Sequence, residues 1–465
     1  MTAGRLSPAM TARLLQYSDV ENAHDDPERI ARLAGLIDEL RGDDALVVGT
    51  GDDFAPGVLS MVSEGGQALD FYRRVDPALE TFGNHDFDYG ADRALEIATE
   101  SPQTWLTANV RRDGGRLGAD RGVERVAVRS VDGLDVGFFG VTAPETAASN
   151  PGAVGLSFGT PLSAGREAVE TLREEGVDRV VALSHLGGGD PELARALDVD
   201  AVLGGHLHSE TAERVDGVPL ARPGVNGRRL VELDLESGAV TLHDVCDGPV
   251  DEGLREAVAR RRETADLSRV VTTVERPVRR DEEAVFGGEA PIGNFVADAF
   301  GRHGVDREVD LALQNSGGIR SGAPLSGEVT VADLVSVLPF EERVVAVEVD
   351  GATLRAALAS AGDRVSFGAS NWWHAHLSGA RVRYHREEGL RSVTVGGESL
   401  SEERTYTLAT SEFVLGAGDE FSPLDGTLPV VERGAVQYEA LVDHAREHGV
   451  WTPVEGRVVI EGAVE

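Results

Sequence analysis

The sequence predicts an α/β domain followed by a mixed α+β domain. The chain has 465 residues, too many for one hydrophobic core, and this length fits two domains. Its hydrophobic fraction of 41% is sufficient for folded cores and excludes a disordered acidic protein. The first half alternates short apolar runs with helix-like segments, whereas the second half is mixed. We expect domains at residues 1–247 and 270–465, joined by a linker helix at residues 248–269.

In the first half, three segments have the periodicity of amphipathic helices. They are ERIARLAGLIDELRG, the residues around 65–74 and GREAVETLREEG. The stretch VERVAVRSVDGLDVGFFGVT is a predicted β-hairpin with Asp132 and Gly133 at its turn. Strands that alternate with helices indicate a layered α/β domain in which helices cover the faces of a sheet.

The segment at residues 248–269, GPVDEGLREAVARRRETADLSR, is strongly charged and has few apolar positions. This composition favours an exposed helix between two bodies. From Val270 to the end of the chain the pattern is mixed, with strand candidates in RVVAVEVDG, ARVRYHR and TYTLATS. These features predict the α+β class for the second domain.

The charge balance is strongly acidic. The chain has 80 acidic and 44 basic residues, a net charge of −36, and contains no lysine. A nucleic-acid-binding protein needs a basic surface, so this balance argues against nucleic acid as a partner. Acidic residues are spread evenly along the chain, which suits solubility at high salt, where self-repulsion is screened. We therefore expect a halophilic source, in particular a halophilic archaeon.

The cysteine count and hydropathy bear on the cellular location. Cys246 is the only cysteine, so no intrachain disulfide is possible and no oxidising compartment is implied. The N-terminus lacks a long apolar segment, and no run of 18 apolar residues occurs. These observations predict a cytoplasmic protein without a membrane partner. An extracytoplasmic location is the alternative if a precursor was trimmed, and both a monomer and a homodimer are compatible with the sequence.

Five strand-like runs of the first half end in turns that carry metal-type ligands, and most of these turns contain glycine. The turns are YSDVE, GTGDD, FGNHDFDYG, LSHLGG and GGHLH. One such turn is weak evidence, because an aspartate in a glycine turn is ordinary turn chemistry. The carboxyl ends of strands in an α/β sheet lie along one edge, so five such ends would converge on one crevice. The candidate ligands are Asp19, Glu21, Asp52, Asp53, Asn84, His85, His185, His206 and His208.

Mixed carboxylate, amide and imidazole donors favour divalent ions such as Mn, Zn, Fe or Co over a thiolate-rich structural zinc site. So many candidates are too many for one ion. They fit a pair of ions roughly 3.5–4 Å apart, an arrangement that activates water and clamps phosphoryl oxygens.

The motifs GNHDFD, GGHLH and NSGGIR together resemble those of the 5′-nucleotidase family. In that family a calcineurin-like metallophosphoesterase domain precedes a nucleotide-recognition domain, and the resemblance covers nearly the whole chain. It implies a four-layer α/β/β/α sandwich for the first domain. It also implies hydrolysis of phosphoric esters with two divalent ions, either Mn, Zn, Mg or Co.

The resemblance assigns roles to individual residues. Asp52 resembles the carboxylate that bridges both ions. The implied metal ligands are Asp19, Glu21, Asp52, Asn84, His185, His206 and His208. The family has Asp-x-His at the first turn, whereas this chain has Glu21 in place of that histidine. Glu21 would either ligate a harder ion such as Mn or Mg, or leave a weaker site and itself face solvent or support the ligands. The nearby His24 is a less favoured substitute for it.

The turn FGNHDFDYG also matches the catalytic His–Asp pair of the family. His85 would stabilise charge on the transferring phosphate, and Asp88 would orient its imidazole. Asp86, which lies between them, is assigned to the turn or to support of the ligands.

In the second domain, Asn315 and Arg320 of NSGGIR match the substrate contacts of the family, and a guanidinium suits phosphate. An arginine common in the family just before EAPIGN is absent here, because the chain reads FGGE. Phe413 matches one of two rings that stack on the base, and Asp419 matches the acid that binds ribose. Trp373 and His374 are the two candidates for the other ring.

The resemblance therefore implies release of phosphate from nucleoside 5′-monophosphates by metal-activated water, with a small-molecule nucleotide as partner. Hydrolysis of UDP-sugars or cyclic nucleotides on the same fold is the alternative. Thiosulfate-ester hydrolysis is a third branch of the family. A non-catalytic nucleotide sensor is a hypothesis from another class, supported by Glu21 and the missing arginine.

Overall fold

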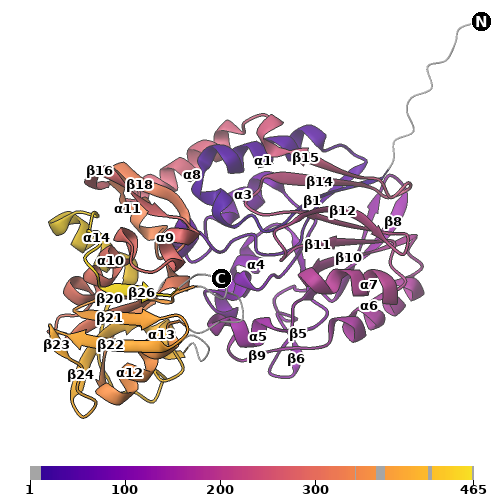
Figure 1. The fold of residues 1–465 in the computed structure, drawn as a ribbon. Coiled ribbons are helices and arrows are strands. Elements are labelled where there is room, and N and C mark those ends of the chain that lie inside the picture. The colour runs from indigo at the N-terminus through magenta and orange to yellow at the C-terminus, as the bar shows by residue number, and fades with distance from the viewer. Residues whose placement is uncertain (1–11, 341, 363–371, 417–420, 463–465) are drawn as a thin grey trace, which may run out of the picture. The chain divides into compact units, whose positions relative to one another are not determined.

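The computed structural model describes residues 12–340, 342–362, 372–416 and 421–462. The chain forms two compact units, residues 1–265 and 266–465, here called the N-terminal and C-terminal units (Figure 1). None of the helices in the described ranges is both long and apolar enough to span a lipid bilayer.

The N-terminal unit contains two six-stranded sheets. The first has the order β15 (Val240–Asp244), β14 (Arg229–Asp234), β1 (Arg13–Tyr17), β2 (Ala45–Gly49), β3 (Leu79–Thr81) and β4 (Thr104–Leu106). Strands β1 to β4 are parallel, so their carboxyl ends lie at one edge, and β14 and β15 are antiparallel additions.

The second sheet has the order β12 (Glu210–Val215), β13 (Val218–Pro223), β11 (Ala201–Gly204), β10 (Arg179–His185), β8 (Leu134–Thr142) and β7 (Val126–Val131). Strands β8, β10, β11 and β13 are parallel, and β7 and β12 pair antiparallel at the edges. The predicted hairpin is confirmed as β7–β8, with Asp132 and Gly133 both at positive φ, 46° and 82°. Such a turn matches the twist of the paired strands.

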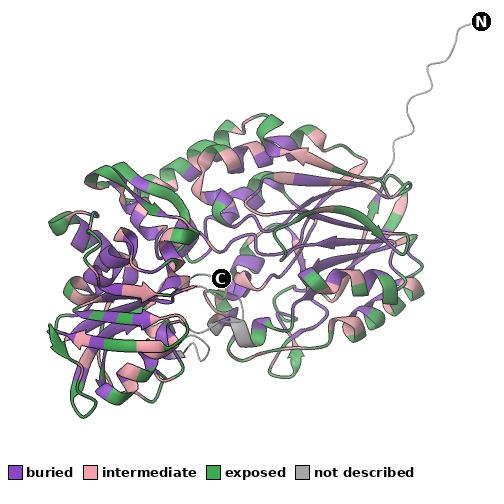
Figure 2. Cartoon of the chain, viewed as in Figure 1, coloured by how far each residue is buried: buried purple, intermediate pink, exposed green. Residues whose placement is uncertain are grey.

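The two sheets pack face to face around a buried apolar layer. Leu14 and Val48 contribute from the first sheet, and Phe138 and Val181 from the second. The neighbouring Phe139 belongs to a different core, beneath the helices, because successive side chains of a strand point to opposite faces. Burial is concentrated in these strands, as Figure 2 shows.

Helices cover the outer faces of both sheets. Helix α1 (Pro27–Leu40) packs on the first sheet beside α3 (Ala68–Val75) and α8 (Glu252–Thr264), and α6 (Pro161–Glu175) and α7 (Asp190–Ala196) pack on the second. The predicted four-layer α/β/β/α sandwich is thereby confirmed. Smaller elements of the unit are α2 (Val58–Ser63), α4 (Ala91–Glu100), α5 (Thr146–Ser149) and a sheet of β6 (Gly115–Arg116), β5 (Val110–Arg112) and β9 (Leu156–Phe158).

Helix α8 is the helix expected at residues 248–269. It is shorter than expected, and it packs against α1 and α3 of the N-terminal unit. Leu254 and Val258 are its buried residues, and most of its other side chains are charged or small. This narrow apolar stripe explains why the sequence of α8 resembles that of a free-standing exposed helix.

The C-terminal unit contains a five-stranded sheet of β20 (Ala375–Ser378), β17 (Leu311–Asn315), β24 (Thr405–Ser411), β19 (Arg343–Asp350) and β25 (Val430–Val436). A second sheet consists of β23 (Glu398–Ser399), β22 (Gly389–Val395), β21 (Ala380–His385) and β26 (Val458–Glu461), and β16 (Val270–Arg280) pairs with β18 (Gly322–Thr330). The helices are α9 (Glu282–Phe286), α10 (Pro291–Ala299), α11 (Val331–Val335), α12 (Gly351–Ser360), α13 (Glu412–Gly416) and α14 (Gln437–His448). A π-helical turn, η6 (Phe300–Gly304), continues α10. The mixed α+β class is confirmed.

Candidate metal centre

Asp52, His185 and His206 form the first group of possible metal ligands. Each offers one ligand atom, and these atoms all lie within 4.8 Å of one another. Asp52 follows β2 of the first sheet, whereas His185 ends β10 and His206 follows β11 of the second sheet. The predicted convergence of strand ends therefore involves two facing sheets and not the single edge that the sequence suggested.

Asp19, Glu21 and His208 form a second group, whose ligand atoms also lie within 4.8 Å of one another. Nε2 of His208 lies 3.2 Å from Oε1 of Glu21 and 3.9 Å from Oδ1 of Asp19. Asp19 and Glu21 are buried, and His208 is exposed. Glu21 thus points toward the other members of its group, where a ligand would have to be.

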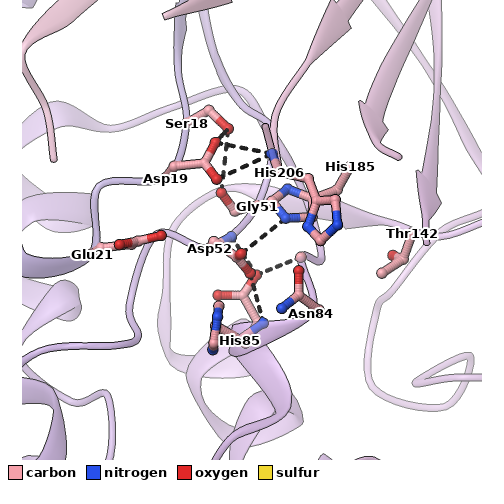
Figure 3. Close-up of polar contacts among 12 residues, drawn as sticks. Ser18, Asp19, Glu21, Gly51, Asp52, Asn84, His85, Thr142, His185 and His206 are labelled. Carbon is pink, nitrogen blue, oxygen red and sulfur yellow. Dashed lines mark hydrogen bonds and ion pairs between the residues drawn. The ribbon is translucent and has the colours of Figure 1, made fainter. Parts of the chain in front are cut away.

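The two groups are joined by direct contacts. The backbone N–H of His206 donates to both carboxylate oxygens of Asp19, at 3.1 and 3.2 Å, and the Ser18 hydroxyl donates to Asp19 at 2.6 Å (Figure 3). A Cβ on Gly205 would lie 2.9 Å from Oδ2 of Asp19 and 2.9 Å from Nδ1 of His185. Gly205, the second glycine in GGHLH, is therefore needed because the two groups of ligands approach its backbone closely.

The residues fit divalent ions chemically as well as geometrically. Within the described part of the chain, Oδ1 of Asn84 is buried and has no hydrogen-bond partner, although Asn84 lies beside Asp52 in Figure 3. A buried acceptor without a donor is costly, and a cation would satisfy it. Carboxylate, amide and imidazole donors together suit Mn, Zn, Mg or Co.

Backbone conformation marks the same residues. Asp19, Glu21, Asp52 and His206 have positive φ angles of 48°, 43°, 57° and 70°. Residues other than glycine rarely adopt a positive φ, and backbone strain of this kind is concentrated at functional sites. Four of the seven predicted ligands are thus held in an uncommon conformation.

The carboxylates differ in their electrostatics. Burial alone would raise the pKa of Asp52, but the His185 imidazole, whose Nε2 lies 2.9 Å away, lowers the pKa to about 2. Burial raises the pKa of Asp19 to about 7 and also raises the pKa of Glu21. Three buried carboxylates in one place favour a bound cation, because buried charge requires a counter-charge.

His85 lies in a short 3₁₀ turn after β3, and its Nδ1 is 3.0 Å from Oδ2 of Asp88. Burial opposes the charged form of His85, but the hydrogen bond with Asp88 and the charge of Asp52 raise its pKa to about 10. The side chain is 38% exposed, so a substrate can reach this cationic ring.

Asn150 also belongs to this site, although the sequence did not indicate it. Its amide donates to Oδ1 of Asp88 at 2.7 Å and to the backbone carbonyl of Asn84 at 2.6 Å. The only signal in the sequence is the dipeptide Asn150-Pro151, which is typical of any turn.

The remaining polar residues of these turns support the ligands. Oδ2 of Asp86 accepts hydrogen bonds from the backbone N–H groups of Asp52 and Gly83, at 3.1 and 2.7 Å, as its assignment to the turn implies. Oδ1 of Asp53 accepts from the N–H of Val20 at 3.2 Å. His24 is buried, and its Nε2 lies 2.8 Å from the Asp53 carbonyl, so its ring belongs to the interior and does not substitute for Glu21.

The residues expected to bind substrate lie in the C-terminal unit. Asn315 is buried at the end of β17, Arg320 is exposed with its guanidinium carbon 4.9 Å from the Phe340 ring centroid, and Phe413 is 44% exposed. Asp419 lies outside the described residues.

Trp373 and His374, the two candidates for the second stacking ring, are each only 1% exposed. The Trp373 indole packs in the apolar core and donates to the Ala375 carbonyl at 2.6 Å. Both rings are buried and so not open to a stacking base, which is a correction to the sequence-based expectation. The partly exposed ring in this stretch is Trp372, which stacks on Phe286 with a centroid distance of 3.8 Å.

Two family profiles match the chain. The profile described as calcineurin-like phosphoesterase matches residues 12–210, and that of the 5′-nucleotidase C-terminal domain matches residues 270–426. The chain is 24% identical over 494 residues to the 5′-nucleotidase of Diplobatis ommata, covering 92% of this chain and 84% of that protein.

The chain is 25% identical over 470 residues to the trifunctional nucleotide phosphoesterase protein YfkN of Bacillus subtilis, covering 91% of this chain but only 31% of YfkN. The activities of that longer protein are therefore not transferred to this chain. Among solved structures, a 5′-nucleotidase precursor from Thermus thermophilus superposes with a TM-score of 0.75 at 24% identity, covering 98% of this chain and 100% of that one. At this identity the likeness shows the fold alone.

The fold and the first profile define the chain as a phosphoric ester hydrolase of the calcineurin-like phosphoesterase class, a class that uses divalent metal ions. The second profile narrows the assignment: the chain belongs to the 5′-nucleotidase family. The resemblance stated from the sequence is thereby confirmed, whereas the halophilic source stays a prediction.

Proposed function

We propose that this chain releases inorganic phosphate from nucleoside 5′-monophosphates with the help of two divalent metal ions. The first ion would be held by Asn84, His185 and His206, the second by Asp19, Glu21 and His208, and Asp52 would contact both. The observation that carries the proposal is the adjacency of two ligand groups joined through Asp19 and His206. When bound, the ions would activate a water molecule and neutralise the phosphoryl oxygens.

His85 and Asp88 have a separate role in the proposal. Asp88 holds Nδ1 of His85, which leaves Nε2 as the ring nitrogen outside that pair. The hydrogen bond with Asp88 favours the cationic form of the ring, which would stabilise negative charge that develops on the transferring phosphate. The uncommon positive φ angles of four ligands support a site built to hold charge in one geometry.

Nucleotide selection is assigned to residues 270–465. Arg320 and Phe413 are accessible, and they offer a guanidinium for phosphate and a ring for base stacking. Asn315 adds an amide at the end of β17. Hydrolysis of UDP-sugars or cyclic nucleotides is the alternative, because it would use the same ligand groups with a different nucleotide pocket.

Hydrolysis of AMP, UDP-glucose, 3′,5′-cyclic AMP and bis(p-nitrophenyl) phosphate tests these alternatives. The product measured is inorganic phosphate for AMP, UMP for UDP-glucose, AMP for the cyclic nucleotide and p-nitrophenol for the diester. Each substrate is assayed with Mn²⁺, Mg²⁺, Co²⁺ and Zn²⁺ at high salt. We expect AMP to be the preferred substrate. A preference for UDP-glucose or cyclic AMP would replace the proposal with its alternative.

A pair of variants separates an enzyme from a nucleotide sensor. His85→Ala should abolish turnover while metal binding remains, because His85 is not assigned as a ligand. His385→Ala, on β21 of the other unit, is the matched control and should turn over normally. Nucleotide binding without turnover in the unmodified protein would instead establish the sensor.

A further inference from the structure

A third group of possible metal ligands lies in the C-terminal unit and consists of His303, His444 and His448. His303 belongs to the π-helical turn η6, and the other two belong to α14, which packs against η6. His444 and His448 are four residues apart, so they lie one above the other on the same face of the helix. The three histidines come from the same unit, and none of them belongs to the site proposed above.

The three imidazoles are close enough to share one ion. One ring nitrogen from each lies within 4.8 Å of the corresponding atoms of the other two. The ring centroids are 4.8 Å apart for His444 and His448, 5.3 Å for His303 and His444, and 5.8 Å for His303 and His448. In a tetrahedral site, metal–nitrogen bonds of about 2.0–2.1 Å place the nitrogens about 3.3 Å apart. A small movement of the three rings toward one another would therefore let all three bind the same ion.

Burial makes this cluster costly without a ligand. His444 is only 2% exposed, and the His303 side chain is 16% exposed. Within the described part of the chain, Nδ1 of His444 and Nε2 of His303 are buried and have no hydrogen-bond partner. Buried polar atoms are rarely left in this state, and a shared cation would satisfy both.

The surroundings suit a cation. The Glu447 carboxylate lies 3.9 Å from Nε2 of His303 and 3.8 Å from Nε2 of His448, so negative charge is adjacent to the three rings. His448 is 42% exposed, which gives a metal ion access from solvent and leaves room for water or Glu447 as a fourth ligand. Short π-helical turns such as η6 are often found at functional sites.

We propose that His303, His444 and His448 bind one divalent transition-metal ion of the zinc type. Three neutral imidazoles select Zn²⁺, Co²⁺, Ni²⁺ or Cu²⁺ and disfavour Mg²⁺ and Mn²⁺, which prefer oxygen ligands. This donor set differs from that of the N-terminal unit, which mixes carboxylates and an amide with its imidazoles. The bound ion links the C-terminal end of α14 to η6.

The test counts metal ions and does not depend on activity. Full-length protein without a histidine tag is stripped with a chelator and equilibrated with Zn²⁺, and bound zinc is measured by plasma mass spectrometry. We expect His303→Gln and His448→Gln each to bind one Zn²⁺ fewer per chain than the unmodified protein, with at least a tenfold loss of affinity in competition with a chromophoric chelator. His385→Gln, a histidine outside the cluster, is the matched control and should keep the full zinc content.

Two further measurements, of Mn²⁺ content and of the unfolding temperature, complete the test. Mn²⁺ content should be equal in the unmodified protein and in both variants, because the three-histidine site disfavours Mn²⁺. Zn²⁺ should raise the unfolding temperature of the unmodified protein more than that of His448→Gln, whose substituted residue is partly exposed and tolerant of change. Equal zinc content in all four proteins would overturn the proposal. AMP turnover is recorded separately, so failure of the proposed phosphatase activity would leave this test intact.

Discussion

Asp88 contacts both His85 and Asn150, so residues from two segments of the chain form one unit around a single imidazole. The sequence predicted His85 and Asp88, because they share one short motif. It could not predict Asn150, which lies 62 positions away from Asp88, because only the folded chain brings the two together. Trp373 shows the opposite limit: the family resemblance offered it as a ring that stacks on the base, whereas its indole packs in the core.

The Asp88–His85 contact predicts the effect of Asp88→Asn. An amide would remove the negative charge that keeps His85 cationic, while the geometry of the turn would be nearly unchanged. We expect kcat for AMP to fall by about 10²-fold, within the range for a positioned acid–base group. Bound metal, measured in parallel, should not change, and a loss of metal instead of turnover would show that Asp88 supports the ligands.

Stability should depend on pH through His376. Burial lowers the pKa of His376 to about 4 from the ordinary histidine value of 6.5. Between pH 6.5 and 4 the unfolded chain therefore binds a proton at this residue that the folded chain does not, so stability falls on acidification by up to about 1.4 kcal/mol per pH unit for one proton. Urea unfolding of His376→Gln should show a shallower fall over this range, whereas an identical slope would show that His376 does not contribute.

At the scale of elements, the parallel strands of the two facing sheets determine where the ligands meet. Polar candidate ligands lie a few residues after β1, β2, β3 and β11, and His185 ends β10. This pattern was visible in the sequence. The division of the strands between two sheets was implied only by the family resemblance, because the pairing itself depends on contacts between distant segments. Strand alternation in β8 then sends Phe138 and Phe139 into different cores.

Substitution of Gly205 tests how closely the ligands are packed around its backbone. Alanine there would place a Cβ 2.3 Å from Oγ of Ser18 and 2.9 Å from Oδ2 of Asp19, so Asp19 must move. We expect Gly205→Ala to weaken Mn²⁺ binding at least tenfold, or about 1.4 kcal/mol, in isothermal titration. Gly188→Ala is the matched control, because no atom lies within 4 Å of the added Cβ. Equal affinities of the two variants would mean that the loop adjusts without cost.

At the scale of the whole molecule, a net charge of −36 acts on the folded chain as a uniform repulsion. Ion pairs such as Arg13 with Asp44 and Arg457 with Asp298 use part of the arginine content, but 44 basic residues cannot neutralise 80 acidic ones. The composition indicated this property without any knowledge of the fold, and the fold does not remove it.

Salt should therefore stabilise the protein. Screening shortens the range of the repulsion, so we expect the unfolding temperature to rise by about 10 °C or more between 0.2 and 3 M KCl, equivalent to a few kcal/mol. Sorbitol at equal osmolality, which does not screen charge, should produce a smaller rise. An unfolding temperature that is flat or falls with KCl would contradict the predicted halophilic adaptation.

Anomalous X-ray scattering from crystals grown with Mn²⁺ tests the proposed two-metal site most directly. We predict two peaks in the N-terminal unit, roughly 3.5–4 Å apart, with Asp52 in contact with both. One ion would have His185 and His206 as neighbours, and the other Asp19 and His208. Crystals of active protein that show no ion at Asp52, or ions bound away from these residues, would contradict the proposal.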